Sequence, residues 1–121
     1  MKNRFVRMVL LAGIAAIAII STGVQWAQTS PRRIEVTAKK FAFDPGDITL
    51  KKGEPIMFIF KSADVSHGLR FRELNFDVKA RAGSTSEVQF TPEKTGDFVG
   101  HCSVFCGSGH GSMKLTLHVV D

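Results

Sequence analysis

The feature that most constrains the fold is a succession of short apolar segments, separated by turn residues, that fills the chain from Ile34 to Asp121. Ile34–Ala38 and Ile48–Leu50 alternate between apolar and polar residues, and the Asp-Pro-Gly-Asp sequence at Asp44–Asp47 is a strong turn signal between them. No stretch of useful length in this part of the sequence has helical periodicity. The pattern therefore predicts strands joined by short turns.

The remaining segments extend the same pattern to the C-terminus. Pro55–Phe60 is almost wholly apolar, which predicts a central strand, and Lys114–Val120 places alternate apolar residues on one face. The other expected strands are Phe41–Phe43, Leu69–Phe71, Phe76–Val78, Ser86–Phe90 and Asp97–Cys102. Short strands at this spacing predict an all-β Greek-key sandwich, and the 10 phenylalanines can fill its core.

The N-terminal segment differs in composition from the rest of the chain. Lys2, Arg4 and Arg7 precede an uncharged, mostly apolar run that extends to Trp26. This run predicts one apolar helix, either a retained membrane anchor, which needs about 20 apolar residues, or a cleaved signal peptide. We therefore expect residues 1–27 to be the anchor or signal peptide, residues 28–33 a linker, and residues 34–121 a folded domain.

Both alternatives export the domain, because the basic N-terminal flank stays in the cytoplasm. Retention of the helix gives a single-pass protein of the cytoplasmic membrane with its domain on the periplasmic side, and cleavage gives a soluble periplasmic protein. Of the 16 Lys and Arg residues, three precede the apolar run, which leaves thirteen beside 11 Asp and Glu. This weak, scattered excess of positive charge does not indicate a nucleic-acid partner.

The run from Cys102 to Met113 gathers the side-chain types that bind soft metal ions. It holds both cysteines of the chain, His110 and Met113, and its glycines permit unusual backbone angles. Thiolate and thioether sulfur favour copper, imidazole suits copper as well, and zinc sites rarely use a thioether. The run therefore predicts a copper site for electron transfer on a loop between two strands.

A further ligand is expected from a distant turn, Asp64–Gly68, which contains His67. A sandwich can place this turn beside the Cys102–Met113 loop, so that His67 completes the ligand set. Two alternatives stay open: a disulfide between the cysteines, which is common in exported proteins, and a surface position for the histidine. We expect His101 to point away from the site, because it adjoins a ligand in an extended segment, and His118 to be structural.

The pattern Cys-x3-Cys-x3-His-x2-Met, with a glycine after the second cysteine and an upstream Asp-Val-x-His-Gly turn, resembles the CuA domain of cytochrome c oxidase subunit II, a cupredoxin family. The resemblance covers residues 34–121 and includes the Phe41–Phe43 strand and the Thr95-Gly96 approach to the loop. Mononuclear blue-copper loops have one cysteine, whereas this loop has two. The resemblance implies a cupredoxin-like sandwich with a dinuclear copper centre.

The resemblance also implies a role for each ligand. Cys102 and Cys106 bridge two copper ions, His67 and His110 bind one ion each, and Met113 and the backbone carbonyl of Val104 are weak ligands. The domain would accept electrons from a cytochrome c or another small redox protein and pass them to the catalytic subunit of a terminal heme-copper oxidase. Nothing in the sequence suggests a general acid, a nucleophile or a substrate pocket, so the domain is expected to be a relay and not itself a catalyst.

Three departures from the family pattern shape further expectations. Val104 stands where family members often carry a glutamate that supports a magnesium site, and the sole tryptophan, Trp26, lies outside the domain. The domain is slightly basic, whereas acidic docking residues are common in the family. We therefore expect the donor to dock through apolar contacts at Phe105 or Phe41. The alternatives to an oxidase subunit are a free-standing CuA protein, an exported copper carrier or metallochaperone, and a disulfide-bonded structural sandwich.

Overall fold

The computed structural model describes residues 23–24 and 30–121 of the chain. The apolar helix expected within residues 1–27 lies almost wholly outside these residues. Within the described part, no helix combines the length and the apolar character that crossing a membrane requires.

The domain is built from nine described strands and two short 3-10 helices. In chain order these are β1 (Arg32–Lys39), β2 (Ala42–Asp44), β3 (Asp47–Lys51), β4 (Ile56–Ser62), β5 (His67–Phe71), η1 (Arg72–Leu74), β6 (Phe76–Ala80), β7 (Thr85–Phe90), β8 (Gly96–His101), η2 (His110–Ser112) and β9 (Lys114–Val120). Each strand expected from the sequence overlaps one of these strands. The all-β sandwich is thereby confirmed.

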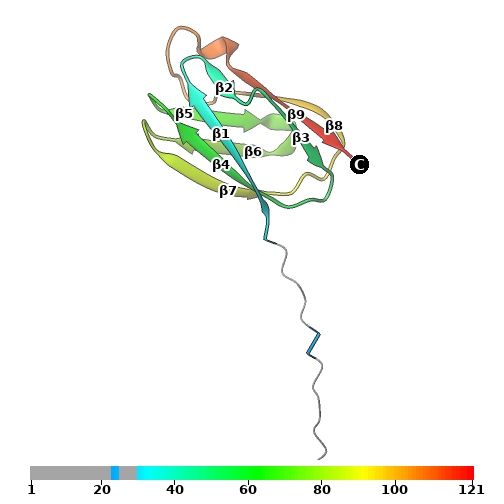
Figure 1. Cartoon of the computed structure of the whole chain (residues 1–121). Helices are drawn as coiled ribbons and strands as arrows, with labels where there is room; N and C mark the ends of the chain where they lie inside the picture. Colours follow the sequence, from blue (N-terminus) through cyan, green and yellow to red (C-terminus); the bar gives the residue numbers. More distant parts are fainter. Residues whose placement is uncertain (1–22, 25–29) are drawn as a thin grey trace, which may run out of the picture.

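The strands form two sheets that pack face to face (Figure 1). One sheet has the order β2-β1-β4-β7, and the other has the order β3-β9-β8-β5-β6. Two of the pairings, β1 with β4 and β3 with β9, are parallel and join segments that are distant in sequence. β4 lies between β1 and β7, which confirms that the apolar Pro55–Phe60 segment belongs to a central strand.

Phenylalanine rings fill the space between the sheets, as the composition predicts. Phe76 is the centre of the cluster: its ring meets Phe58, Phe71 and Phe90 edge-on, with centroids 5.3, 5.8 and 5.2 Å away. Such edge-to-face pairs add to the stabilisation that apolar burial provides. The core thus fixes the two sheets relative to each other. It thereby also fixes the ends of β5, β8 and β9, which carry the site.

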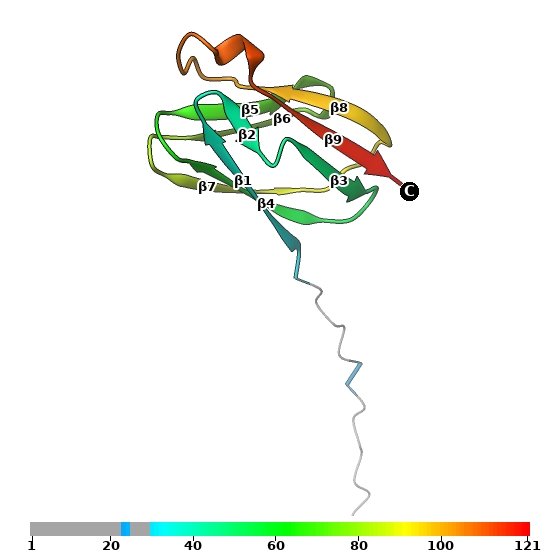
Figure 2. The same ribbon diagram turned by 45° about the horizontal axis from the view of Figure 1, so that its top comes forward.

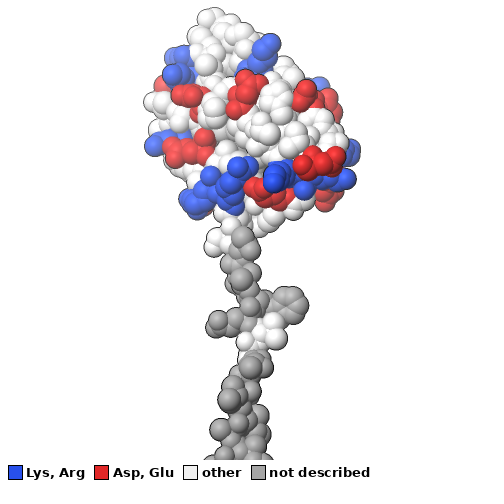
Figure 3. Space-filling model, turned by 45° about the vertical axis from the view of Figure 1, so that its right-hand side comes forward, with Lys and Arg blue, Asp and Glu red and all other residues white. Residues whose placement is uncertain are grey.

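The loop between β8 and β9 lies at the end of the sandwich opposite the start of β1 (Figures 1 and 2). The β1–β2 hairpin and the β4–β5 turn reach the same end, because Phe41 packs under the loop and Gly68 accepts a hydrogen bond from it. The loop itself carries no Lys, Arg, Asp or Glu, and the tip of the domain in Figure 3 is correspondingly free of charge. Three segments distant in sequence therefore meet at one end of the sandwich, and the outermost of them, the loop, carries no charge.

Candidate metal centre

His67 is the first residue of β5 and is completely buried. It therefore belongs to a strand end and not to the preceding turn, where the sequence placed it. Its Nε2 atom lies 2.6 Å from Oδ1 of Asp64, and its Nδ1 atom lies 3.9 Å from Sγ of Cys102. The two ring nitrogens thus face different surroundings: a carboxylate on one side and sulfur on the other.

Asp64 determines which of these nitrogens carries the proton. Burial would raise the pKa of its carboxyl, but hydrogen bonds from the Lys40 backbone N–H, the His67 ring and the Val65 backbone N–H outweigh this effect and lower the pKa to about 2. An ionised carboxylate can only accept hydrogen bonds, so Nε2 of His67 donates and Nδ1 keeps its lone pair toward the sulfur. This is the arrangement by which a carboxylate orients a metal-binding histidine.

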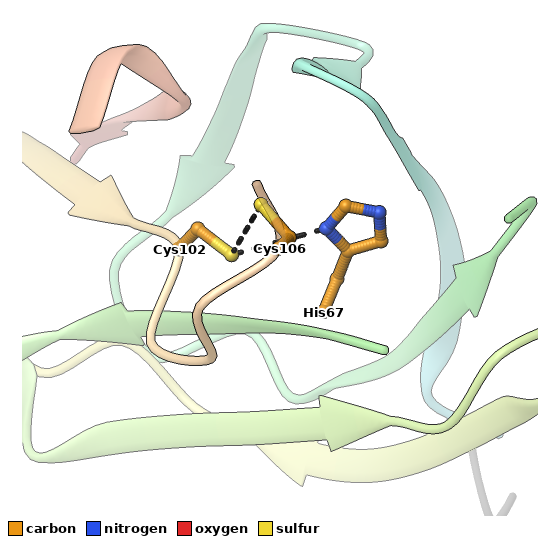
Figure 4. Close-up of side chains that lie close together, drawn as sticks. All are labelled: His67, Cys102 and Cys106. Carbon is orange, nitrogen blue, oxygen red and sulfur yellow. Dashed lines mark hydrogen bonds between the residues drawn. The ribbon is translucent and has the colours of Figure 1, made fainter. Parts of the chain in front are cut away.

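Cys102 and Cys106 of the loop have their side chains next to each other, and both are buried and free (Figure 4). Their Sγ atoms are 3.8 Å apart, far outside the bonding distance of a disulfide. Together with a ring nitrogen of His67, the two sulfur atoms form a group in which all ligand atoms lie within 4.8 Å of one another. The structure therefore places His67 of β5 next to Cys102 and Cys106 of the loop, as the sequence predicts.

The other three expected ligands lie around the same pair of sulfur atoms. The carbonyl oxygen of Val104 is 3.1 Å from Sγ of Cys102. Nδ1 of His110 and Sδ of Met113 lie 3.6 and 3.4 Å from Sγ of Cys106. Each sulfur atom thus has one imidazole nitrogen near it, and a further weak donor lies beside each.

The ligand loop is held from below by an aromatic ring. A Cβ atom added to Gly109 would collide with the ring of Phe41, and one added to Gly107 would come within 2.9 Å of it. Gly107 also has a φ of 136°, which side-chain-bearing residues rarely adopt. On the other side, the Ser103 backbone N–H donates to the Gly68 carbonyl at 3.3 Å. The loop is therefore fixed between the β1–β2 hairpin and β5.

The electrostatics of the pocket favour a bound cation. Burial raises the pKa of the Cys106 thiol to about 11, and the neighbouring Cys102 and the charge of Asp64 act in the same direction. Without a cation, this thiol keeps its proton at neutral pH. A soft metal ion would stabilise the thiolate form, and the donors present are two sulfurs of thiols, one thioether, two imidazole nitrogens and one carbonyl, a set that fits copper.

The other two described histidines lie outside the group formed by His67 and the two cysteines. His101 is exposed at the end of β8 and borders a cavity that Cys102 and His110 also line. His118 forms hydrogen bonds to Asp97 at 2.7 Å and to Asp47 at 2.9 Å, in line with the structural role expected for it. Phe105 is 78% exposed, and its ring centroid lies 5.6 Å from that of His110. Sequence reasoning missed the roles of Asp64 and of the Phe41 ring. A carboxylate three residues before His67 was the available signal for the first.

Comparison with known proteins adds three findings. A family model described as a cupredoxin-like domain matches residues 9–113. The cytochrome c oxidase subunit 2 of Thermus thermophilus is 34% identical over 96 residues, which cover 78% of this chain and 71% of that relative. Further relatives with this description are longer, and the chain spans 57% of one and 24% of another.

Among solved structures, a chain of a heme-copper terminal oxidase dimer matches with a TM-score of 0.66 and 28% identity, over 75% of this chain and 66% of that one. The periplasmic domain of subunit II of cytochrome oxidase (CoxB) of Bradyrhizobium japonicum matches with a TM-score of 0.68 over 77% of this chain and 86% of that one. At 23% identity, the second likeness concerns the fold alone.

Proposed function

Because this chain belongs to the cytochrome c oxidase subunit 2 family and carries its cupredoxin-like domain, we propose that it transfers electrons through a dinuclear copper centre of the CuA type. The observation that carries the proposal is the convergence of two free thiols with imidazole nitrogens at 3.9 and 3.6 Å from them. A single blue-copper site needs one thiolate, and a structural disulfide needs a covalent bond. Neither accounts for the whole donor set.

The proposed ligands are His67, Cys102, the Val104 carbonyl, Cys106, His110 and Met113. Two sulfur atoms 3.8 Å apart support a bridging role for the cysteines, since each can face two metal ions at once. One imidazole beside each sulfur supports one histidine for each ion. The Val104 carbonyl and the Met113 thioether then supply one weak contact at either end.

Copper bound in this way would supply a one-electron redox couple. The residues of this chain supply rigidity and exclusion of water, both of which limit the rearrangement that accompanies a change of charge. His67, Cys102, Cys106 and Met113 are all at most 6% exposed, and strands β5, β8 and β9 hold the two ends of the ligand set. Asp64 holds His67 in one tautomer, so the ring does not have to reorient.

We propose that the electron donor docks at the exposed tip of the ligand loop. Phe105 is 78% exposed, contacts the ring of His110, and lies in a segment without charged side chains. A donor such as cytochrome c or another small redox protein would meet an apolar surface there. The rate of electron transfer is then expected to change little with salt, because apolar contacts are little screened. A rate that falls steeply with salt would contradict this docking mode.

The remaining parts of the proposal concern the setting of the domain. Residues 1–27 would form a single membrane anchor, or a signal peptide that is cleaved, and residues 28–33 a linker. The domain would lie on the periplasmic side, next to the catalytic subunit of a terminal oxidase. Co-purification of an oxidase with the full chain from detergent-solubilised membranes tests this setting, and isolation of the chain alone would favour a free-standing electron carrier.

The copper-carrier alternative is separated from the CuA proposal by metal content. We expect two copper ions per chain after reconstitution of the full chain in detergent, measured by mass spectrometry of the metal against protein concentration. One copper per chain would favour an exported carrier or metallochaperone. Absence of copper together with an oxidised cysteine pair would favour a structural sandwich.

A further inference from the structure

A groove of about 480 Å³ lies beside the candidate metal centre, on the side of Val104. Its lining includes Val104, Lys79, Arg81 and the hydroxyl-bearing residues Ser66, Ser84 and Ser86. His67 also borders it. The groove therefore reaches the protein surface at one end and two candidate ligands at the other.

The charges around this groove are positive. Lys79 and Arg81 are both exposed, and no Asp or Glu lies among its described lining residues. The ion pairs found within residues 30–121 do not involve Arg81. Lys79 lies 3.4 Å from Asp77, but that carboxylate is shared with Arg70 at 2.7 Å and with the Ser103 hydroxyl at 3.0 Å. The groove thus keeps positive charge that the domain itself does not neutralise.

Such a groove repels a divalent cation and attracts carboxylates. The Ser86 hydroxyl already donates to the Lys79 carbonyl at 2.6 Å. The hydroxyls of Ser66 and Ser84 can donate hydrogen bonds to carboxylate oxygens, and Arg81 can bind a carboxylate through two N–H groups. Val104 and Ala80 add aliphatic surface, so the groove also accepts an apolar side chain. Its volume of about 480 Å³ exceeds what a single small anion would fill.

We propose that this groove is the docking site for an acidic segment of a partner protein. The inference rests on the proposed function, because the groove borders Val104 and His67, two of the proposed copper ligands, and a partner bound there would lie next to the electron carrier. The segment would place its carboxylates against Lys79 and Arg81 and an apolar side chain against Val104. Phe105, the exposed residue of the loop tip, does not line this groove, so the proposed donor contact and this contact use different side chains.

The test uses the full chain in an uncharged detergent and a fluorescently labelled hexaglutamate peptide, with binding followed by fluorescence anisotropy. We expect saturable binding that weakens as salt rises, and no binding of a hexalysine peptide. The double variant Lys79→Gln/Arg81→Gln is expected to lower the affinity about tenfold, since it removes both charges that face the peptide. Ser84→Glu, which puts a carboxylate into the groove without removing a cation, is expected to lower it similarly.

The matched control is Lys51→Gln/Lys52→Gln, which removes the same number of exposed charges near the C-terminal end of β3, away from the groove. It is expected to bind the peptide like the unchanged chain. Equal losses in the control and the groove variant, equal binding of hexalysine, or no effect of Ser84→Glu would each overturn the proposal. Because the assay needs no copper, binding by a chain that fails to take up two copper ions would refute the CuA function and leave the groove intact.

Discussion

At the scale of single residues, the contact between Asp64 and His67 is the one on which the order of the site depends most. The buried ring of His67 lies 2.6 Å from the Asp64 carboxylate, which also accepts hydrogen bonds from the backbone N–H groups of Lys40 and Val65. We expect Asp64→Ala to lower the affinity for copper about 10- to 100-fold, the usual cost of losing such an orienting partner. Asp64→Asn, which keeps an acceptor oxygen, should lose less.

Competition with a copper chelator of known affinity measures this effect. Asp44→Ala is the control, because Asp44 is exposed in β2 and makes no described side-chain contact with the ligands. An unchanged affinity in Asp64→Ala would mean that packing alone orients the His67 ring.

The Cys106 thiol makes copper uptake dependent on pH. Its pKa of about 11 means that the thiol is protonated at neutral pH in the metal-free protein, so copper must displace a proton. The apparent affinity for copper should therefore fall as pH falls, and uptake at pH 7 should release protons. Calorimetry in buffers of different ionisation enthalpy counts them. An affinity that does not change with pH would show that Cys106 is not a ligand.

The sequence allowed the residues that gather around the two thiols to be predicted because their chemical types and spacing are unusual together. Cys102, Cys106, His110 and Met113 lie in one segment, and the turn that contains His67 completes the pattern. The pairing of Asp64 with the distal nitrogen could not be predicted in the same way, since a carboxylate three residues from a histidine is common. The positive groove at Lys79 and Arg81 was also missed, because these residues meet Val104 only in the fold.

At the scale of elements, the ligand loop depends on the ring beneath it. We expect Gly109→Ala to destabilise the domain by roughly 1–3 kcal/mol, the usual cost of forcing an extra methyl group into a packed region, because the new Cβ would collide with Phe41. Gly111→Ala, in the same loop, meets nothing within 4 Å and should change stability by less than about 0.5 kcal/mol.

Urea unfolding of both variants measures this difference. The combination of Gly109→Ala with Phe41→Ala, which removes the colliding ring, tests the mechanism. It should lose less stability than the sum of the two single changes. Equal stabilities of the two glycine variants would contradict the packing role of Phe41.

A pair of hydrogen bonds from His118 links three neighbouring strands on the outer face of one sheet. His118 of β9 forms hydrogen bonds to Asp47 of β3 and to Asp97 of β8. Both hydrogen bonds raise the pKa of the His118 imidazole, and the bond to Asp47 has the larger effect. The stabilisation is therefore complete below the ordinary histidine pKa of 6.5 and is lost as pH rises through the higher folded-state value.

Melting temperatures of the metal-free chain and of His118→Gln, measured across this pH range, test the contact. The unchanged chain should exceed the variant most at acidic pH, and the two should approach each other as pH rises. A gap that widens with pH would show that the neutral ring, and not the charged one, stabilises the three strands.

The strands themselves were largely predictable from alternation and turn residues, as in Lys114–Val120 and the turn at Asp44–Asp47. Their partners were not. The parallel pairings of β1 with β4 and of β3 with β9 join distant segments, and a local pattern holds no information on which distant strand supplies the neighbour. The start of β5 at His67 also escaped prediction, since Asp64–Gly68 has the composition of a turn.

At the scale of the whole molecule, the domain combines a rigid apolar core, which includes five buried phenylalanines, with an end where three distant segments meet under an uncharged loop. The core fixes the strand ends, and the strand ends fix the loop and His67. These in turn place four donor atoms around the two cysteine sulfurs. Phe105 at the uncharged tip does not line the positive groove, so the domain offers one apolar and one basic surface, which suits a protein that receives an electron from one partner and gives it to another.

The electron paramagnetic resonance spectrum of the full chain, after reconstitution with copper and partial reduction, tests the dinuclear centre directly. We expect the hyperfine pattern of one unpaired electron shared equally by two copper nuclei, and its loss in both Cys102→Ser and Cys106→Ser. A pattern from a single copper nucleus in the unchanged chain, at full copper occupancy, would contradict it.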